Sequence, residues 1–168
     1  MKLGIVFGCF IPLHAGHYKL IDQALSENAA VLLGICGHDG DRGEGYLSFP
    51  ERQNLMRMKY GSDRNIALSV VDDNKIGLTG KFDREAWEIW SREFFHNAGV
   101  DPNSDIEFTW YTGDPSYVDT ISQVFPKHKF TLIERDDVSG TNIRNDIKDY
   151  ASYIDPMFLR YLIEHNRI

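Results

Sequence analysis

Long apolar runs are missing from this sequence of 168 residues. No stretch approaches the roughly 18 apolar residues that a helix needs to cross a bilayer. The N-terminal segment MKLGIVFGCF carries one lysine and a short apolar stretch, without the small-residue cleavage site that ends a signal peptide. The sequence therefore predicts a cytoplasmic protein with no membrane partner, in which this segment forms a buried first strand.

Cysteine is scarce as well. The two cysteines, Cys9 and Cys36, match no metal-ligand spacing. A disulfide between them stays open as an alternative, although reduced thiols are the usual state in the cytosol.

Basic residues are outnumbered, with 18 Lys and Arg against 25 Asp and Glu and a formal net charge of −7. This balance argues against non-specific nucleic-acid binding, which needs a basic face to displace counterions. We therefore expect no nucleic-acid partner. Any phosphate ligand must be held by a few local groups rather than by the overall field.

Short apolar runs alternate with amphipathic stretches along the whole sequence. These patterns predict strands at 2–7, 30–36, 66–71, 106–112 and 129–134, and helices at 14–26, 49–58, 83–97, 116–124, 141–150 and 156–166. Such alternation is typical of right-handed βαβ units. The fold class is therefore α/β: a Rossmann-like, doubly wound five-stranded parallel sheet with C-terminal helices, in one domain over 1–168. Ligands of such sheets bind where the strand order reverses, so we expect a site at the loops after the first and fifth strands.

The loop after the first strand reads G-C-F-I-P-L-H-A-G-H, from Gly8 to His17. Gly8 allows a sharp turn and the close approach of a phosphate, and Pro12 stiffens the turn. His14 and His17 are three residues apart in the first helical turn, so they share a face beside N–H groups that attract anions. A lone H-x-x-H is more often a pair of surface histidines. This H-x-x-H pair lies between a strand and a helix, and that position favours a functional role: stabilising the charge on a phosphoryl group.

The second motif, V-S-G-T-N-I-R, follows the fifth predicted strand. Ser139 and Thr141 are natural helix N-caps, and Arg144 lies in the first turn, where it can reach back to the helix start. An ordinary capped helix with a surface arginine is the alternative interpretation. Together with the first motif, however, the pattern predicts a phosphate cradle with a permanent cation. By contrast, Lys81 in G-L-T-G-K-F lacks the spacing and the hydroxyl residue of a Walker A loop.

The pattern G-x-F-x-P-x-H-x-G-H resembles the signature of the HIGH-motif nucleotidyltransferases, and V-S-G-T-N-I-R resembles their I-S-x-T-x-I-R motif. The resemblance implies direct in-line attack of a substrate phosphate on the α-phosphate of ATP, which releases pyrophosphate. It implies that the catalytic residues are His14, His17 and Arg144, and that ATP is bound by Gly8, Phe10, His14, Gly16, His17, Asp114, Ser139, Thr141 and Arg144. Magnesium is expected on the ATP phosphates, because it binds mainly through substrate oxygens, and no protein ligand for it is predicted.

Further motifs resemble the NadR-type nicotinamide-nucleotide adenylyltransferase domain over nearly the whole chain: P-E-R near 50, W-E-I-W near 87 and Y-T-G-D near 111. This resemblance implies that the partners are ATP and nicotinamide mononucleotide, in NAD biosynthesis. Its implied acceptor-binding residues are Phe7, Trp87 and Arg52. Trp87 would stack on the nicotinamide, although aromatic residues at helical spacing usually belong to the core. Arg42, in the polar loop after the second strand, could reach a phosphate, and a simple solvated loop is the alternative. A homo-oligomer is a further possibility.

Cys9 is the main departure, since this branch usually has lysine at that position. The alternatives are therefore another HIGH-motif transferase, with nicotinate mononucleotide or phosphopantetheine as acceptor or with CTP and an alcohol phosphate, and a module that senses NAD or ATP without turnover.

Overall fold

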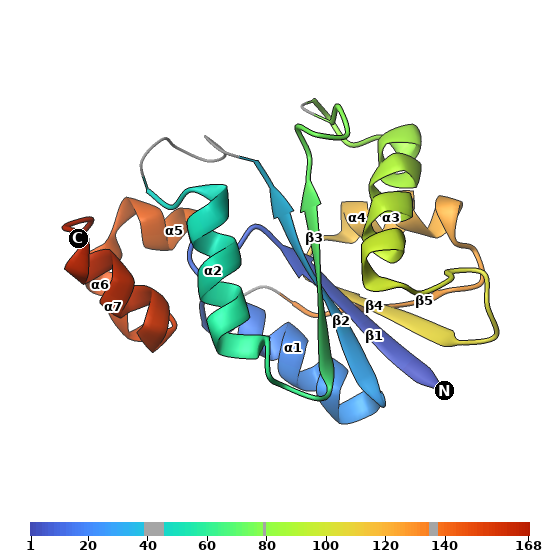
Figure 1. Cartoon of the computed structure of the whole chain (residues 1–168), viewed down its shortest axis with the longest axis horizontal. Coiled ribbons are helices and arrows are strands. Elements are labelled where there is room, and N and C mark those ends of the chain that lie inside the picture. The colour runs from blue at the N-terminus through green and yellow to red at the C-terminus, as the bar shows by residue number, and fades with distance from the viewer. Residues whose placement is uncertain (39–45, 79, 135–137) are drawn as a thin grey trace.

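The computed structural model describes residues 1–38, 46–78, 80–134 and 138–168. Five parallel strands form a sheet in the order β3-β2-β1-β4-β5 (Figure 1). The strands are β1 (Lys2–Gly8), β2 (Ala30–Gly37), β3 (Ile66–Asp72), β4 (Glu107–Thr112) and β5 (Lys129–Leu132). This is the predicted α/β fold with a five-stranded parallel sheet, and the strand positions agree with the apolar runs of the sequence.

Helices cover both faces of the sheet (Figure 1). They are α1 (Ala15–Glu27), α2 (Phe49–Tyr60), α3 (Arg84–Ala98), α4 (Pro115–Val124), α5 (Gly140–Asn145), α6 (Ile147–Tyr150) and α7 (Pro156–Glu164), with a 3-10 turn η1 (Ala151–Tyr153) before α7. One hydrophobic core contains residues of α1, α2, α5 and α7, and the other contains residues of α3 and α4. The two cores lie on opposite faces of the sheet.

Side chains that alternate along the central strands pack into the two cores in turn. In β1, Ile5 belongs to the core under α3 and α4, and its neighbour Val6 belongs to the core under α1 and α2. Leu32 and Leu33 of β2 divide in the same way. A strand that is buried on both faces must be apolar at every position, which explains the continuous apolar runs in the sequence.

The segment after β5 differs from the prediction of one helix over 141–150. The structure breaks it at Asp146, whose backbone leaves the helical region at φ −148° and ψ 70°. The Asp146 side chain accepts a hydrogen bond from the N–H of Asp149 and so caps α6 as a new helix. Aspartate competes for backbone N–H groups in this way, and the helical periodicity of the sequence does not reveal it. The last helix is also shorter than predicted and ends at Glu164, just before Asn166 adopts a left-handed φ of 55°.

The strand order adds the loop after β4 to the expected site. The order reverses between β1 and β4, so the loops after these two strands flank the switch point. β5 lies at the edge of the sheet, next to β4. Ile133 and Glu134, directly after β5, and Val138 and Ser139, directly before α5, line the cleft together with the end of β1.

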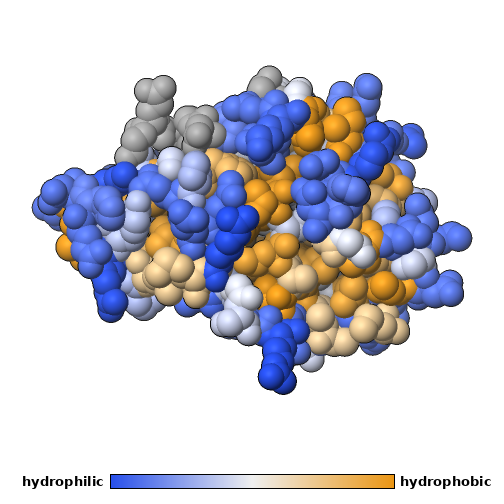
Figure 2. Space-filling view, viewed as in Figure 1, coloured by the Kyte–Doolittle hydropathy of each residue, from blue (hydrophilic) through white to orange (hydrophobic). Residues whose placement is uncertain are grey.

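Figure 2 shows the face on which α2, β3 and α3 lie in front. Polar side chains cover the helices, and apolar side chains reach the surface along β3 between them. β3 is the outermost strand on this side. In the described part of the chain, no helix has both the length and the apolar character that a membrane span requires.

Candidate functional site

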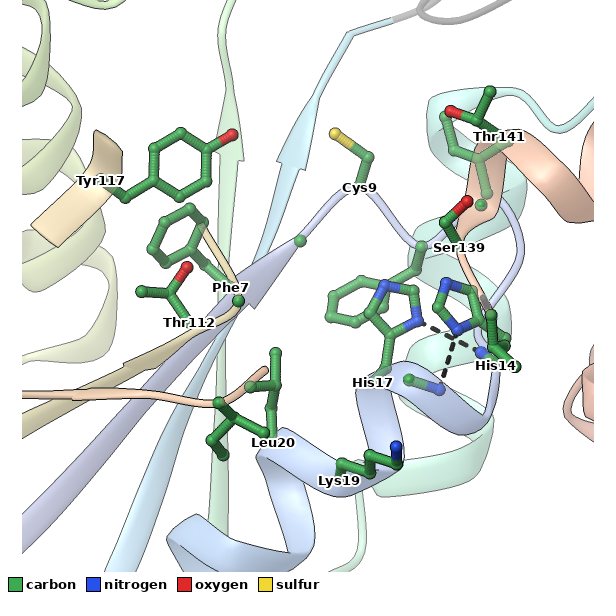
Figure 3. A pocket seen from close by; sticks show the side chains of 18 of the residues that line it. Phe7, Cys9, His14, His17, Lys19, Leu20, Thr112, Tyr117, Ser139 and Thr141 are labelled. Atoms are coloured by element: carbon green, nitrogen blue, oxygen red, sulfur yellow. Dashed lines mark hydrogen bonds between the residues drawn. The ribbon is translucent and has the colours of Figure 1, made fainter. Parts of the chain in front are cut away.

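A cleft lies beyond the carboxyl ends of β1 and β4, at the switch point of the sheet, and both sequence motifs line it (Figure 3). Among the predicted site residues, its lining contains Phe7, Gly8, Phe10, His14, Gly16, His17, Ser139, Thr141 and Arg144. Trp87, Arg52 and Asp114 are not part of this lining. The fold therefore brings together two motifs that are about 120 residues apart in the sequence.

The two histidines orient each other at the start of α1. His14 is the N-cap, and its Nδ1 accepts a hydrogen bond of 3.0 Å from the N–H of Gly16. Nδ1 of His17 accepts a 3.2 Å bond from the N–H of His14 (Figure 3). The two rings lie 3.9 Å apart between centroids. A neutral imidazole with an accepting Nδ1 carries its proton on Nε2, so each ring presents an Nε2–H donor.

Gly8 and Gly16 leave room that the site needs. A Cβ atom at Gly8 would lie 3.7 Å from Nε2 of His17, so this donor faces the backbone turn at the end of β1. A Cβ atom at Gly16 would lie only 3.0 Å from the carbonyl oxygen of Val138. The absence of a side chain at Gly16 therefore allows the second motif to pass directly over the start of α1.

Arg144 ties the second motif to the first. Its Nη1 donates a 2.7 Å hydrogen bond to the carbonyl oxygen of Ile11, and its Nη2 donates a 3.3 Å bond to the Thr141 hydroxyl. Ser139 caps α5 by accepting a hydrogen bond from the N–H of Asn142. The guanidinium is thus held at the start of α5, on the side of the cleft opposite β4.

The charge of the cleft is opposite to that of the whole molecule. Lys19 and Arg144 contribute permanent cations to the described lining, against the single carboxylate of Glu134. Burial raises the pKa of Tyr46, near Arg144, to about 12, which keeps this phenol neutral beside the cation. Lys19 was not predicted from the sequence, because its spacing from His17 does not indicate the helix face that borders the cleft. An acidic protein thus presents a cationic lining to an anionic ligand.

Arg52 lies beneath the cleft rather than in its lining, so its predicted contact with the acceptor stays a prediction. Its side chain is 0% exposed. Nη1 donates to the carbonyl oxygens of Cys9 and Cys36 at 2.8 and 3.0 Å, and Nη2 donates to that of His38 at 3.0 Å. The structure therefore gives Arg52 the role of joining the chain segments that follow β1 and β2.

Trp87 also lies behind the wall of the cleft, in contrast to its predicted stacking on an acceptor ring. It is 4% exposed and packs against Phe7 and Tyr117, with ring centroids 5.5 and 5.3 Å away. Phe7 and Tyr117 themselves line the cleft (Figure 3). Tyr117 was not predicted, because a tyrosine in the first turn of a short helix carries no distinguishing sequence signal.

Asp114 follows β4 at the switch point and caps α4, where its carboxylate accepts hydrogen bonds from the N–H and the hydroxyl of Ser116 at 2.9 and 2.7 Å. Its neighbours Thr112 and Gly113 line the cleft. A contact between Asp114 and the nucleotide stays a prediction. Arg42 lies outside the described residues.

The chain is similar to known proteins in sequence and in fold. A family model described as cytidylyltransferase-like matches residues 5–148. The trifunctional NAD biosynthesis/regulator protein NadR of Escherichia coli K12 is 28% identical over 179 residues, which cover 94% of this chain and 41% of that protein. The chain thus spans less than half the length of this relative.

Two crystal structures of NadR are similar in fold as well as in sequence. The complex with NR has a TM-score of 0.75 and 29% identity, over 94% of this chain and 44% of the other. The complex with NAD and AMP-PNP has a TM-score of 0.71 and 28% identity, over 94% of this chain and 45% of the other.

Proposed function

The chain belongs to the cytidylyltransferase-like family and is a nucleotidyltransferase, and on this premise we propose that it transfers AMP from ATP to nicotinamide mononucleotide. The products are NAD and pyrophosphate. One observation carries the proposal: the two histidines line one cationic cleft with Ser139, Thr141 and Arg144 at the switch point of the sheet. The similarity to NadR proteins, one of them in complex with NAD and AMP-PNP, supports the choice of nucleotides. We propose that 1–168 acts as a single nucleotidyltransferase domain.

In the proposed reaction, a phosphate oxygen of the mononucleotide attacks the α-phosphorus of ATP in line with the bond to the bridging oxygen. The new P–O bond forms as the α,β-bridging bond breaks, and pyrophosphate leaves with that electron pair. The attacking oxygen is already deprotonated, so the step needs no general base. The protein accelerates it by positioning the phosphates and stabilising the charge that develops on them.

The hydrogen-bond donors of the cleft fall into two groups, one for the α-phosphate and one for the leaving pyrophosphate. The Nε2–H groups of His14 and His17 donate to the α-phosphate, whose charge grows in the transition state. Arg144, with the hydroxyls of Ser139 and Thr141, holds the β- and γ-phosphates and stabilises the leaving pyrophosphate. Lys19, exposed at the rim of the cleft, adds a second permanent cation on the α1 side.

The acceptor then lies on the β4 side of the cleft. Phe7 and Tyr117 present aromatic rings there, backed by Trp87. A flat pyridine ring can pack on such a wall, and burial of aromatic surface adds affinity. Trp87 contributes by fixing the positions of the two rings that line the cleft.

Magnesium is part of this proposal as an ion carried by the nucleotide. Among the described residues, no group of three or more His, Cys, Asp or Glu side chains is arranged to hold a metal ion. Mg²⁺ suits the phosphate oxygens of ATP, because it keeps several waters and needs few protein ligands. When bound, it would neutralise charge on the leaving pyrophosphate.

A pyrophosphate-release assay tests the proposal. We expect turnover with ATP and nicotinamide mononucleotide, loss of turnover when EDTA removes divalent ions, and recovery when Mg²⁺ is added back. Nicotinate mononucleotide, phosphopantetheine and an alcohol phosphate, each with ATP and with CTP, serve as matched acceptors. If turnover occurs only with one of these three alternative acceptors, that compound is the acceptor in place of nicotinamide mononucleotide. If no pair is turned over while NAD or ATP still binds, the chain is a sensing module instead.

A further inference from the structure

Two thiols lie together at the cleft, and the proposed transfer uses neither of them. Cys9 follows directly after β1, Cys36 lies near the end of β2, and both line the cleft. Both are reduced in the structure. Figure 3 shows Cys9 at the end of β1, between the side of the cleft that carries Tyr117 and the side that carries Thr141.

The backbones that carry the two thiols are held close together. β1 and β2 are parallel neighbours, and their pairing ends in register at Gly8 and Ile35, directly before Cys9 and Cys36. Neighbouring strands lie about 4.8 Å apart, and disulfides bridge Cα separations of about 4.4–6.8 Å. Nη1 of Arg52 donates to the carbonyl oxygens of both cysteines, at 2.8 and 3.0 Å. The spacing of the two backbones therefore suits a disulfide.

The two thiols differ in exposure and in their hydrogen bonding. Cys9 is half-buried, whereas Cys36 is buried. A side-chain hydrogen bond between the two sulfurs, followed by burial, raises the pKa of Cys36 well above its ordinary value. Cys36 therefore keeps its proton and donates it to the sulfur of Cys9. Of the two, Cys9 is the thiol that a small molecule in the cleft can reach as a nucleophile.

We propose that Cys9 and Cys36 form a redox-active dithiol, which low-molecular-weight disulfides such as oxidised glutathione convert into an intramolecular disulfide. In the first step the Cys9 thiolate attacks one sulfur of oxidised glutathione, and one glutathione thiolate leaves. In the second step Cys36 attacks the Cys9 sulfur, its proton passes to the leaving glutathione sulfur, and the second glutathione departs as a thiol. The two protein thiols lose two electrons and two protons, and one oxidised glutathione becomes two reduced ones.

Oxidation would also alter the proposed phosphate site, a consequence that rests on the proposed function. Cys9 lies in the turn between β1 and the helix that begins after His14. Closing a disulfide draws this turn toward β2. Since a shift of about 1 Å can cost on the order of 10²-fold in rate, we expect the oxidised protein to turn over about 10²-fold more slowly. Reduction with dithiothreitol restores the rate.

Intact-mass measurement of the whole chain, folded and incubated with oxidised glutathione, tests the dithiol. The expected product has lost two hydrogen atoms and carries no glutathione. The Cys36→Ser variant is expected to retain one glutathione on Cys9, because the second thiol is gone. The matched Cys9→Ser variant is expected to stay unmodified, because Cys36 is buried.

Three results would overturn the proposal: a glutathione that remains on the wild-type chain, a disulfide between two chains, or no reaction before the chain is unfolded in urea. Turnover of the reduced chain is measured separately. A chain that closes the disulfide but turns over no acceptor contradicts the proposed function and leaves the dithiol intact. A chain that turns over the acceptor but forms no disulfide contradicts the dithiol and leaves the proposed function intact.

Discussion

Backbone hydrogen bonds in the first turn of α1 decide which nitrogen of the His14 and His17 rings is the acceptor. Each Nδ1 accepts from a backbone N–H of the same helical turn, at 3.0 and 3.2 Å. Each Nε2 is therefore a donor, without any need for a charged imidazolium. The same two residues thus cap α1 and supply the proposed donors to the α-phosphate, so a simple deletion would confuse stability with catalysis.

Variants of His17 can separate the two roles. Asparagine places a polar group near the position of Nδ1 and glutamine places one near Nε2. We expect His17→Asn to keep the stability of α1 but lower turnover by about 10²-fold or more, as the loss of a donor to a developing anion does. His17→Gln should retain more turnover. The measurement is kcat for pyrophosphate release alongside thermal unfolding, and equal, wild-type-like kcat in both variants would contradict the mechanism.

Among the elements, α2 depends on one carboxylate that the helix shares with the C-terminal segment. Glu51 accepts hydrogen bonds from the N–H of Ser48, from the Tyr161 hydroxyl and from Arg167, the last at 2.8 Å. Burial alone would raise the pKa of Glu51, but these hydrogen bonds outweigh it and lower the pKa from 4.5 to about 2. The charged form of Glu51 therefore stabilises the folded state.

The sign of this shift sets a pH dependence. A depressed pKa in the folded state stabilises the protein fully above pH 4.5, and this stability is lost as the pH falls toward 2. We expect Glu51→Gln to lower the free energy of unfolding by about 1.5–3 kcal/mol at pH 7. The difference from wild type should shrink between pH 4.5 and pH 2. Urea unfolding at several pH values measures this difference in the free energy of unfolding.

Glu88 offers a matched control on α3, where it forms an exposed ion pair with Arg84. Because exposed pairs contribute little, Glu88→Gln should change the free energy of unfolding by less than about 1 kcal/mol at each pH. A difference for Glu51→Gln that stays constant or grows as the pH falls would show that the charge of Glu51 does not stabilise the fold.

At the scale of the molecule, Asp155 joins the C-terminal segment to the start of the site. Its side chain is 0% exposed and accepts hydrogen bonds from Tyr18 of α1 and Lys59 of α2. Burial and the contact with Asp155 raise the pKa of Tyr18, so this phenol stays a donor. The Asp155 N–H donates to the carbonyl oxygen of Leu13 at 2.9 Å, next to His14. The C-terminal helices thus hold the loop that carries the first histidine.

Replacing Asp155 should loosen this connection. Asp155→Asn keeps an oxygen that can cap α7 but loses the charge that Lys59 and Tyr18 contact. We expect the free energy of unfolding to fall by about 1.5–3 kcal/mol, the range for a hydrogen bond to a charged group. Tyr18→Phe, which removes one of the bonds, should cost less. Urea unfolding compares the variants, and wild-type stability of Asp155→Asn would contradict this role.

The sequence by itself determined the elements and the two phosphate-binding motifs, because both are written in local patterns. Continuous apolar runs predicted β1 and β2 most directly, since central strands that are buried on both faces have few polar positions. The spacing of His14 and His17 and the cap at Ser139 are properties of a single helical turn. Such features need no knowledge of the rest of the chain.

Only the tertiary structure decided how the other residues contribute. An arginine or tryptophan in an amphipathic helix has the same local pattern whether it faces a ligand or a core, and packing buried both Arg52 and Trp87. The strand order placed the reversal between β1 and β4 and brought Tyr117 to the cleft. It also set Cys9 beside Cys36, since register between neighbouring strands depends on long-range pairing that residue spacing does not encode.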